Sequence, residues 1–131
     1  MTSLIGVGAS GGEPDRAAYS AAVRFGDLVF VSGQVAMSDD GEPVAPNDFR
    51  AQAGVAFGRL RDVLRNAGSD LDHVAKVTIY VTDRANVSAL VDLRRQWFQD
   101  PFPADTTVVV ASLARAEWMI EVDAVAVMPS A

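Results

Sequence analysis

Residues 48–67 carry apolar side chains at the three- and four-residue spacing that gives a helix a single apolar stripe. Asn47 or Asp48 can cap the amino end of this helix, and Gly68 stands where a left-handed residue often follows a helix. Such a helix is stable when its stripe packs against another element, so the chain has to supply a second layer. The stripe consists of Phe49, Ala53, Ala56, Phe57, Leu60, Val63, Leu64 and Ala67.

Short β-prone runs supply that second layer. Residues 21–25 and 28–32 flank Gly26-Asp27 and indicate a hairpin, while 74–81, 106–111 and 119–127 are typical of further strands. A second helix is expected over residues 86–98, ended by the prolines that follow it. The predicted order is β-β-α-β-α-β-β, an α+β fold in one domain of residues 1–131, with 1–16 as a flexible N-terminal segment.

One face of the predicted sheet has no cover. Two helices can pack on the other face of a mixed sheet, and they use all of the predicted helical sequence. No repeat or linker suggests a second domain that could supply another layer. We therefore expect copies of this chain to associate through the uncovered face.

Composition argues against several classes of function. The net charge of −6, from 11 basic and 17 acidic residues, opposes binding to nucleic acid. With no cysteine and one histidine, His73, neither a thiolate nucleophile nor a multi-histidine metal site is expected. Residues 6–11 spell G-x-G-x-x-G, but no strand precedes them and no helix follows, so a flexible loop is favoured over a phosphate-binding one. Without a signal-peptide pattern or a bilayer-length apolar run, a cytoplasmic protein with no membrane partner is expected.

The last predicted strand carries two carboxylates that alternate with apolar residues. Glu121 and Asp123 fall on the same strand face, about 7 Å apart by the rise of a strand. Two neighbouring carboxylates repel each other and can raise one pKa, which is how a general acid or base is produced. A solvated strand face is the alternative, and spacing alone favours it.

Other polar and aromatic side chains leave alternatives open. Tyr19, just before the first predicted strand, either packs in the core or reaches into a cleft, and its position alone favours the core. Ser32 has no strand–helix elbow around it, so a Ser-His-Asp triad is not expected. Trp97 and Trp118 are interpreted as core or interface anchors, and His73 as a surface residue.

Five phrases occur together in a characteristic order. Tyr19-Ser20 precedes the predicted hairpin, whose second strand continues as LVFVSGQ over residues 28–34. Residues 67–81 are AGSDLDHVAKVTIYV, residues 102–104 are FPA, and residues 120–126 are IEVDAVA. Over residues 19–127 these phrases together resemble the Rid family, the YjgF/YER057c/UK114 group.

The resemblance implies a chorismate-mutase-like fold of the bacillary type. It also implies a homotrimer whose sheets pack into a central barrel, with three ligand clefts between neighbouring subunits. Active members hydrolyse reactive enamines and imines to ammonia and a 2-oxo acid, and need no cofactor or metal. Their water-activating carboxylate matches Glu121, and their cleft tyrosine matches Tyr19.

The sequence departs from the family where active members hold the substrate carboxylate. The arginine that follows the phenylalanine-proline-alanine phrase in those members is Asp105 here, and a helix asparagine matches Val91. Arginine offers a carboxylate a bidentate clamp, whereas aspartate repels it. Arg16, Arg24 and Arg115 are candidates to replace the missing cation.

Two functions therefore stay open, and a third is disfavoured. The first is an enamine or imine deaminase with an altered substrate preference, with Glu121 as catalytic residue. An acidic cleft of Asp105, Glu121 and Asp123 would prefer cationic or neutral ligands. The alternative is a non-enzymatic metabolite-binding or protein-stabilising trimer. Ribonuclease activity, attributed to some relatives, is disfavoured by the net charge and the single histidine. The expected substrate-binding residues are Tyr19, Ser32, Asp105 and Asp123.

Overall fold

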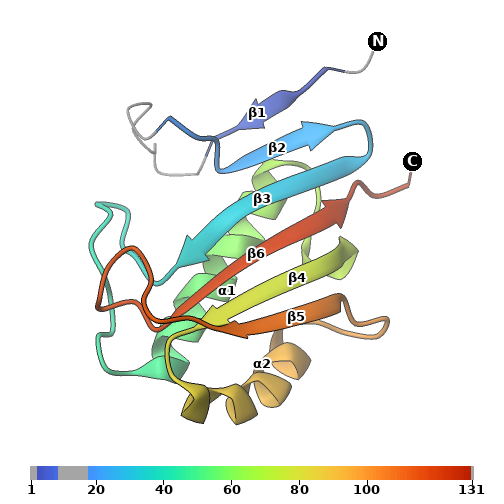
Figure 1. Cartoon of the computed structure of the whole chain (residues 1–131). Helices are drawn as coiled ribbons and strands as arrows, with labels where there is room; N and C mark the ends of the chain where they lie inside the picture. Colours follow the sequence, from blue (N-terminus) through green and yellow to red (C-terminus); the bar gives the residue numbers. More distant parts are fainter. Residues whose placement is uncertain (1–2, 9–17, 131) are drawn as a thin grey trace.

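The computed structural model describes residues 3–8 and 18–130. One six-stranded sheet, in the order β1-β2-β3-β6-β4-β5, carries the helices on one face (Figure 1). The strands are β1 (Ile5–Val7), β2 (Ala22–Phe25), β3 (Leu28–Val35), β4 (Val74–Val81), β5 (Ala104–Val109) and β6 (Ile120–Val127). The helices are α1 (Phe49–Asn66) and α2 (Leu90–Trp97), with short 3₁₀ turns at η2 (Leu71–His73) and η3 (Arg84–Ala89).

The mixed α+β architecture is the predicted one. β2 and β3 form an antiparallel hairpin, β3, β6 and β4 pair antiparallel, and β5 joins the edge parallel to β4. The parallel connection needs a crossover, and η3 with α2 supplies it. The second predicted helix, 86–98, is thus divided between a 3₁₀ turn and α2, and the fifth strand begins two residues before the expected 106.

The core lies between α1 and the sheet. Side chains alternate along β4 and β6, and every second one points to the helices, as Ile79 and Val122 do with no exposed surface. On α1, Phe57 and Leu60 are fully buried against them. The apolar stripe predicted for residues 48–67 packs in this layer.

A strand at the N-terminus was not expected. Residues 5–7, inside the segment 1–16 predicted to be flexible, form β1 and pair antiparallel with β2. Without β1, β2 would be an edge strand with unpaired backbone groups, and even three residues satisfy several of them. Only the first three residues of the G-x-G-x-x-G stretch are described, so its remainder lies outside the described residues.

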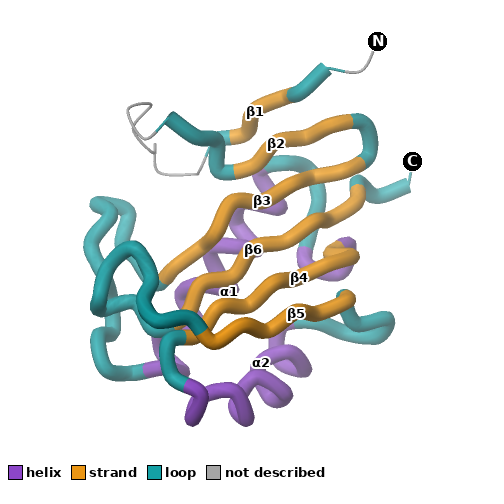
Figure 2. Tube along the Cα trace, viewed as in Figure 1, coloured by secondary structure: helices purple, strands orange, loops and turns teal. Residues whose placement is uncertain are grey.

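The other face of the sheet is open. Figures 1 and 2 show no helix crossing the front of the strands, since both helices lie behind the sheet or below it. By their register, Phe30 pairs with Val125, and Leu28 with both Phe25 and Val127, so these apolar side chains lie together on that face. Phe30 is 44% exposed and Phe25 44%. We call this group the apolar open face.

Candidate functional site

β3 contains a bulge opposite the predicted carboxylates. Val31 pairs with Ala124 of β6 and Gln34 pairs with Val122, so two residues, Ser32 and Gly33, lie opposite the single Asp123. A bulge of this kind bends the strand and redirects the neighbouring side chains. The bulge marks the position where β3 departs from regular alternation beside β6.

The carboxylate of Glu121 occupies the space above Gly33. A β-carbon at residue 33 would lie 2.3 Å from Oε2 and 2.6 Å from Cδ of Glu121. Carbon and oxygen cannot approach that closely, so any larger residue at position 33 would force this carboxylate to move. Gly33 therefore forms a cradle for a partly buried Glu121 side chain.

The two carboxylates of β6 have different surroundings. Burial raises the pKa of Glu121 above its ordinary value, and the charge of Asp123 raises it further. Asp123 instead accepts a hydrogen bond from Tyr80 of β4, with 3.0 Å between Tyr80 Oη and Asp123 Oδ2. This bond is the main cause of the raised pKa of Tyr80, with burial and the two carboxylate charges adding to it. The two carboxylates therefore differ. Asp123 is held by the hydrogen bond from Tyr80, whereas Glu121 has a raised pKa.

A buried glutamine positions the start of β6. Gln52 of α1 has no exposed surface, and its amide accepts a hydrogen bond from Met119 N at 2.8 Å. The same amide donates to the carbonyl oxygens of Glu117 at 2.8 Å and Val44 at 3.3 Å. The sequence held one signal for it, namely a polar residue within the apolar stripe of the helix, one turn after Phe49.

The predicted aromatic and hydroxyl residues lie in different places. Tyr19 is 59% exposed, so the core position favoured by the sequence is wrong. Ser32 lies in the bulge, and its hydroxyl donates to the carbonyl oxygen of Ser20 at 2.6 Å, which ties β3 to the chain before β2. Trp118 is buried, and Trp97 stacks on Phe57 with 5.8 Å between ring centroids, in agreement with their interpretation as anchors.

Asp105 does not share a face with Glu121 and Asp123. The parallel pairing of β5 sets Asp105 beside Val77, whose side chain packs under the helices, whereas Glu121 pairs with Tyr80 on the open side. The acidic cleft expected from the three carboxylates is therefore not formed within one chain. Asp105 is instead engaged by Arg94 of α2.

The ion pair between Arg94 and Asp105 is bidentate. Arg94 Nε lies 2.9 Å from Asp105 Oδ2, and Arg94 Nη2 lies 3.2 Å from Asp105 Oδ1. Thr107 completes the contact, because its hydroxyl accepts from Arg94 Nη2 at 3.0 Å and donates to Asp105 Oδ1 at 2.8 Å. The negative charge at residue 105 is thus matched by a cation from the helix.

The three arginines proposed from the sequence are engaged elsewhere or not described. Arg24 donates to the carbonyl oxygen of Gly26 at 3.3 Å, at the end of the hairpin. Arg115 pairs with Glu117 at 3.2 Å in the loop before β6. Arg16 lies outside the described residues. Sequence reasoning missed Arg94, whose position on the helix preceding β5 was the available signal.

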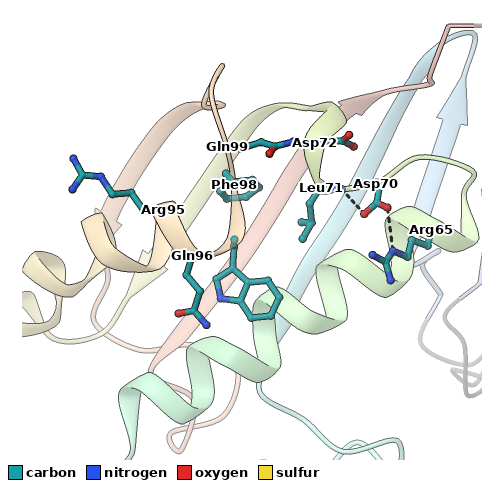
Figure 3. A pocket seen from close by; sticks show the side chains of 9 residues that line it. Arg65, Asp70, Leu71, Asp72, Arg95, Gln96, Phe98 and Gln99 are labelled. Atoms are coloured by element: carbon teal, nitrogen blue, oxygen red, sulfur yellow. Dashed lines mark hydrogen bonds and ion pairs between the residues drawn. The ribbon is translucent and has the colours of Figure 1, made fainter.

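A hollow lies on the helical side of the molecule. It has a volume of about 390 Å³ and is bounded by the carboxyl ends of α1 and α2 and by η2. Figure 3 shows Leu71 and Phe98 among its walls, and an ion pair of Arg65 Nε with Asp70 Oδ2 at 3.1 Å beside it. Because the sheet separates this hollow from Glu121, the two belong to different surfaces of the chain.

Two kinds of site are not found in the described part of the chain. Residues 3–8 and 18–130 hold no group of three or more histidine, cysteine or carboxylate side chains able to bind a metal ion. None of the helices described is both long enough and apolar enough to cross a membrane.

Comparison with known proteins gives a consistent result over most of the chain. The model of the family described as endoribonuclease L-PSP matches residues 12–128. A 2-iminobutanoate/2-iminopropanoate deaminase of Dermatophagoides farinae is 32% identical over 110 residues, covering 84% of this chain and 85% of that protein. The RutC family protein YjgH of Escherichia coli is 40% identical over 106 residues, covering 79% of each.

Solved structures agree with the sequence relatives. Yeast Mmf1 superposes with a TM-score of 0.87 at 28% identity, covering 97% of this chain and all of that one. RidA from an Antarctic Psychrobacter superposes with a TM-score of 0.85 at 25% identity, covering 95% of this chain and 99% of that one. The fold is the chorismate-mutase-like fold of these proteins. The chain therefore belongs to the Rid family, which the family model describes as endoribonuclease L-PSP.

Proposed function

We propose that this protein is a hydrolase of small imines and enamines, of the deaminase type, with Glu121 as the residue that activates water. The observation that carries the proposal is the carboxylate of Glu121 held in the Gly33 cradle, with a pKa raised by burial and by Asp123. A carboxylate with a raised pKa is a stronger base than an ordinary glutamate, and it can accept a proton from water and return it. Relatives at 29% to 32% identity are named 2-iminobutanoate/2-iminopropanoate deaminases, which supports the same chemistry.

The proposed reaction needs one carboxylate and no redox step. Water adds to the carbon of a protonated C=N group while Glu121 accepts one of its protons. Glu121 returns that proton to the nitrogen of the resulting carbinolamine. It then accepts the hydroxyl proton as the C–N bond breaks with its electron pair leaving on ammonia, and a C=O group remains. Ammonia takes this last proton, so the sum is one protonated imine and one water to one carbonyl compound and one ammonium ion. Glu121 acts as base and then as acid, which a raised pKa favours.

The proposed assembly is a homotrimer formed through the sheets. The apolar open face gathers exposed apolar side chains on neighbouring strands, with Phe25 and Phe30 each 44% exposed, and is suited to burial against other copies. Association would also bring residues of different chains together. This matters because Glu121 and the Arg94–Asp105 pair lie on opposite faces of one chain.

The substrate preference should differ from that of relatives with arginine after the phenylalanine-proline-alanine phrase. At that position this chain carries Asp105, already bonded to Arg94, and Val91 stands where active members carry asparagine. A substrate reaching this region meets different polar groups, so its preferred shape should change.

Ammonia release tests the proposal. 2-Iminopropanoate generated in place by an amino-acid oxidase should disappear faster with the protein than without it. Glu121→Gln should lower that acceleration about 100-fold or more, the usual contribution of a general base. Glu42→Gln, an exposed carboxylate of the loop before α1, serves as the matched control and should leave the rate unchanged. Equal rates for the native protein and Glu121→Gln would refute the role of Glu121.

A second function is favoured by one observation. The arginine of active members is absent from residue 105, which supports a metabolite-binding or protein-stabilising trimer without turnover. Calorimetry with small amines, imine analogues and 2-oxo acids distinguishes the two functions. Tight binding without ammonia release from any imine would favour the second.

A further inference from the structure

Tyr80 of β4 lies beside both carboxylates of β6. Its backbone pairs with Glu121, and its hydroxyl reaches diagonally along β6 to Asp123, with 3.0 Å between Tyr80 Oη and Asp123 Oδ2. An aromatic side chain is long enough for such a diagonal contact between neighbouring strands. The side chain of Tyr80 thus starts level with Glu121 and ends at Asp123.

The hydroxyl of Tyr80 remains a donor at every pH where a glutamate titrates. Its hydrogen bond to Asp123 is the largest cause of the raised pKa of Tyr80, and burial and the charges of Asp123 and Glu121 raise it further. Because an ordinary tyrosine ionises only near pH 10, Tyr80 keeps its proton throughout the lower range in which Glu121 titrates. A hydrogen bond to an ionised carboxylate is roughly twice as strong as one between neutral groups, so this bond restrains the orientation of Asp123.

Asp123 in turn acts on Glu121. The two side chains lie on the same face of β6, and the negative charge of Asp123 raises the pKa of Glu121 beyond the increase that burial causes. The strength of this effect depends on the direction in which the Asp123 carboxylate points, because a charge interaction weakens with distance and with exposure to solvent. Tyr80 sets that direction through its hydrogen bond.

The charged side chains of the neighbouring elements are engaged elsewhere. Among the described residues of β3, β4 and β5, the one charged side chain on the open side is Lys76, whose ammonium donates to a threonine of β5. Lys76 lies four residues from Tyr80 along β4, about 13 Å by the rise of a strand. The carboxylate of β5 lies on the helical side, and Arg115 and Glu117 in the loop before β6 pair with each other at 3.2 Å. The charge that raises the pKa of Glu121 therefore comes from its own strand.

We propose that Tyr80 is a positioning residue of the Glu121 site, which fixes Asp123 and thereby makes Glu121 rather than Asp123 the base. The two carboxylates are neighbours on one strand face and chemically alike, so without a further constraint they would share the proton as a pair. The hydroxyl of Tyr80 engages Asp123, and the cradle of Gly33 holds Glu121. The inference rests on the proposed imine hydrolysis and deepens it, because it names the residue that divides the roles of the two carboxylates.

Removal of one hydroxyl tests this role. Tyr80→Phe should move the acid-side midpoint of kcat/KM for 2-iminopropanoate to lower pH, because a released Asp123 turns toward solvent and acts less on Glu121. It should also lower kcat about threefold to tenfold, because a less basic carboxylate accepts a proton from water less readily. Thr78→Val is the matched control. It removes a hydroxyl from the same strand face, paired in register with Asp123, which is bonded to Tyr80 instead, and it should change neither the midpoint nor kcat.

A double variant separates positioning from a general effect on structure. If Tyr80 acts through Asp123, Tyr80→Phe combined with Asp123→Asn should shift the midpoint no further than Asp123→Asn alone. A fall in kcat without a shift of the midpoint would overturn the proposal, and so would shifts that add in the double variant. Urea unfolding of each variant shows whether a loss of activity comes from misfolding.

Two titrations test the proposal without any hydrolysis. Carbon NMR resonances of the Glu121 carboxyl group should show a lower pKa in Tyr80→Phe and in Asp123→Asn than in the native protein. The chain has two tyrosines, so in a Tyr19→Phe protein the absorbance of tyrosinate reports on Tyr80 alone, and Asp123→Asn should lower its midpoint. If these shifts appear while no imine is hydrolysed, the proposed function falls and the positioning role of Tyr80 stands. If Glu121 titrates identically in the native and Tyr80→Phe proteins, or Tyr80 titrates unchanged in Asp123→Asn, the positioning role is refuted.

Discussion

The carboxylate of Glu121 lies where a side chain of Gly33 would begin, because a β-carbon at residue 33 would come within 2.3 Å of Oε2. The two residues belong to neighbouring strands, β6 and β3, and the bulge at Ser32-Gly33 brings them together. The position of the proposed catalytic group therefore depends on the absence of an atom in the neighbouring strand.

Gly33→Ala should displace Glu121 from its cradle. We expect the rate of imine hydrolysis to fall at least tenfold, because a base displaced by about an ångström is no longer correctly oriented toward the reacting water. The helical Gly54 has nothing within 4 Å of an added β-carbon, so Gly54→Ala is a matched control. It should keep full activity and gain about 0.5–1 kcal/mol of stability from helix propensity. Full activity in Gly33→Ala would show that the cradle has no part in catalysis.

The rate of imine hydrolysis should fall on the acid side as Glu121 becomes protonated. Since burial and Asp123 both raise its pKa, the midpoint should lie above 4.5, the ordinary value of a glutamate. Asp123→Asn removes the neighbouring charge and should move the midpoint to lower pH. A kcat/KM profile from pH 4 to 8 for both proteins measures the shift. A midpoint that moves upward in Asp123→Asn would contradict the assignment.

Stability should respond to Glu121 in the direction set by its raised pKa. A carboxyl group with a raised folded-state pKa contributes stability below its unfolded pKa and loses that contribution as pH rises through the folded value. Glu121→Gln should therefore gain stability relative to the native protein between pH 4 and pH 7, by less than about 1 kcal/mol because solvent still screens a side chain that is only partly buried. Urea unfolding at both pH values gives the difference, and a relative loss on raising the pH would contradict it.

Gln52→Leu should destabilise the protein strongly. It leaves Met119 N and the carbonyl oxygen of Glu117 without their partner in a buried region, at about 1–3 kcal/mol for each unpaired group. Gln96→Leu, an exposed glutamine of α2, should stay within about 0.5 kcal/mol of the native protein. Urea unfolding measures both, and equal midpoints would mean that the amide of Gln52 is dispensable.

Phe30→Glu should dissociate the proposed trimer. Three copies of a buried carboxylate on the apolar open face would have to lose their hydration without partners. Light scattering should report one third of the native mass, whereas Ala51→Glu on the exposed side of α1 should keep it. An unchanged mass for Phe30→Glu would place the interface elsewhere.

Features set by local sequence were predictable. Asp48 caps α1 through a hydrogen bond from Ala51 N at 3.0 Å, and Gly68 follows the helix with φ +90, as its position indicated. The alternation that placed Glu121 and Asp123 on one face of β6 is also present. Each depends on neighbours a few residues away, which is the range over which sequence periodicity is informative.

Features set by pairing between distant segments were not predictable. The face of Asp105 depends on the parallel register of β5 against β4, and no residue near 105 indicates that register. The contact of Arg94 follows from the same register. β1 has only three residues, too few to show the alternation of apolar and polar side chains that predicts a strand. It forms because β2 has an edge with which it can pair. The Gly33 cradle depends on the bulge, and the only local signal for the bulge was a glycine within a strand.

The bulge at Ser32-Gly33 also separates two demands on β3. Before it, Val29 and Val31 follow the strict in-and-out order that the core requires, and after it Gln34 resumes pairing one residue later. The extra residue acts as a phase shift between two halves of the strand. Substitutions after the bulge can therefore reshape the surface around Glu121 without altering which residues of the first half of β3 enter the core. The chemistry of this surface can change while the packing of the core stays the same.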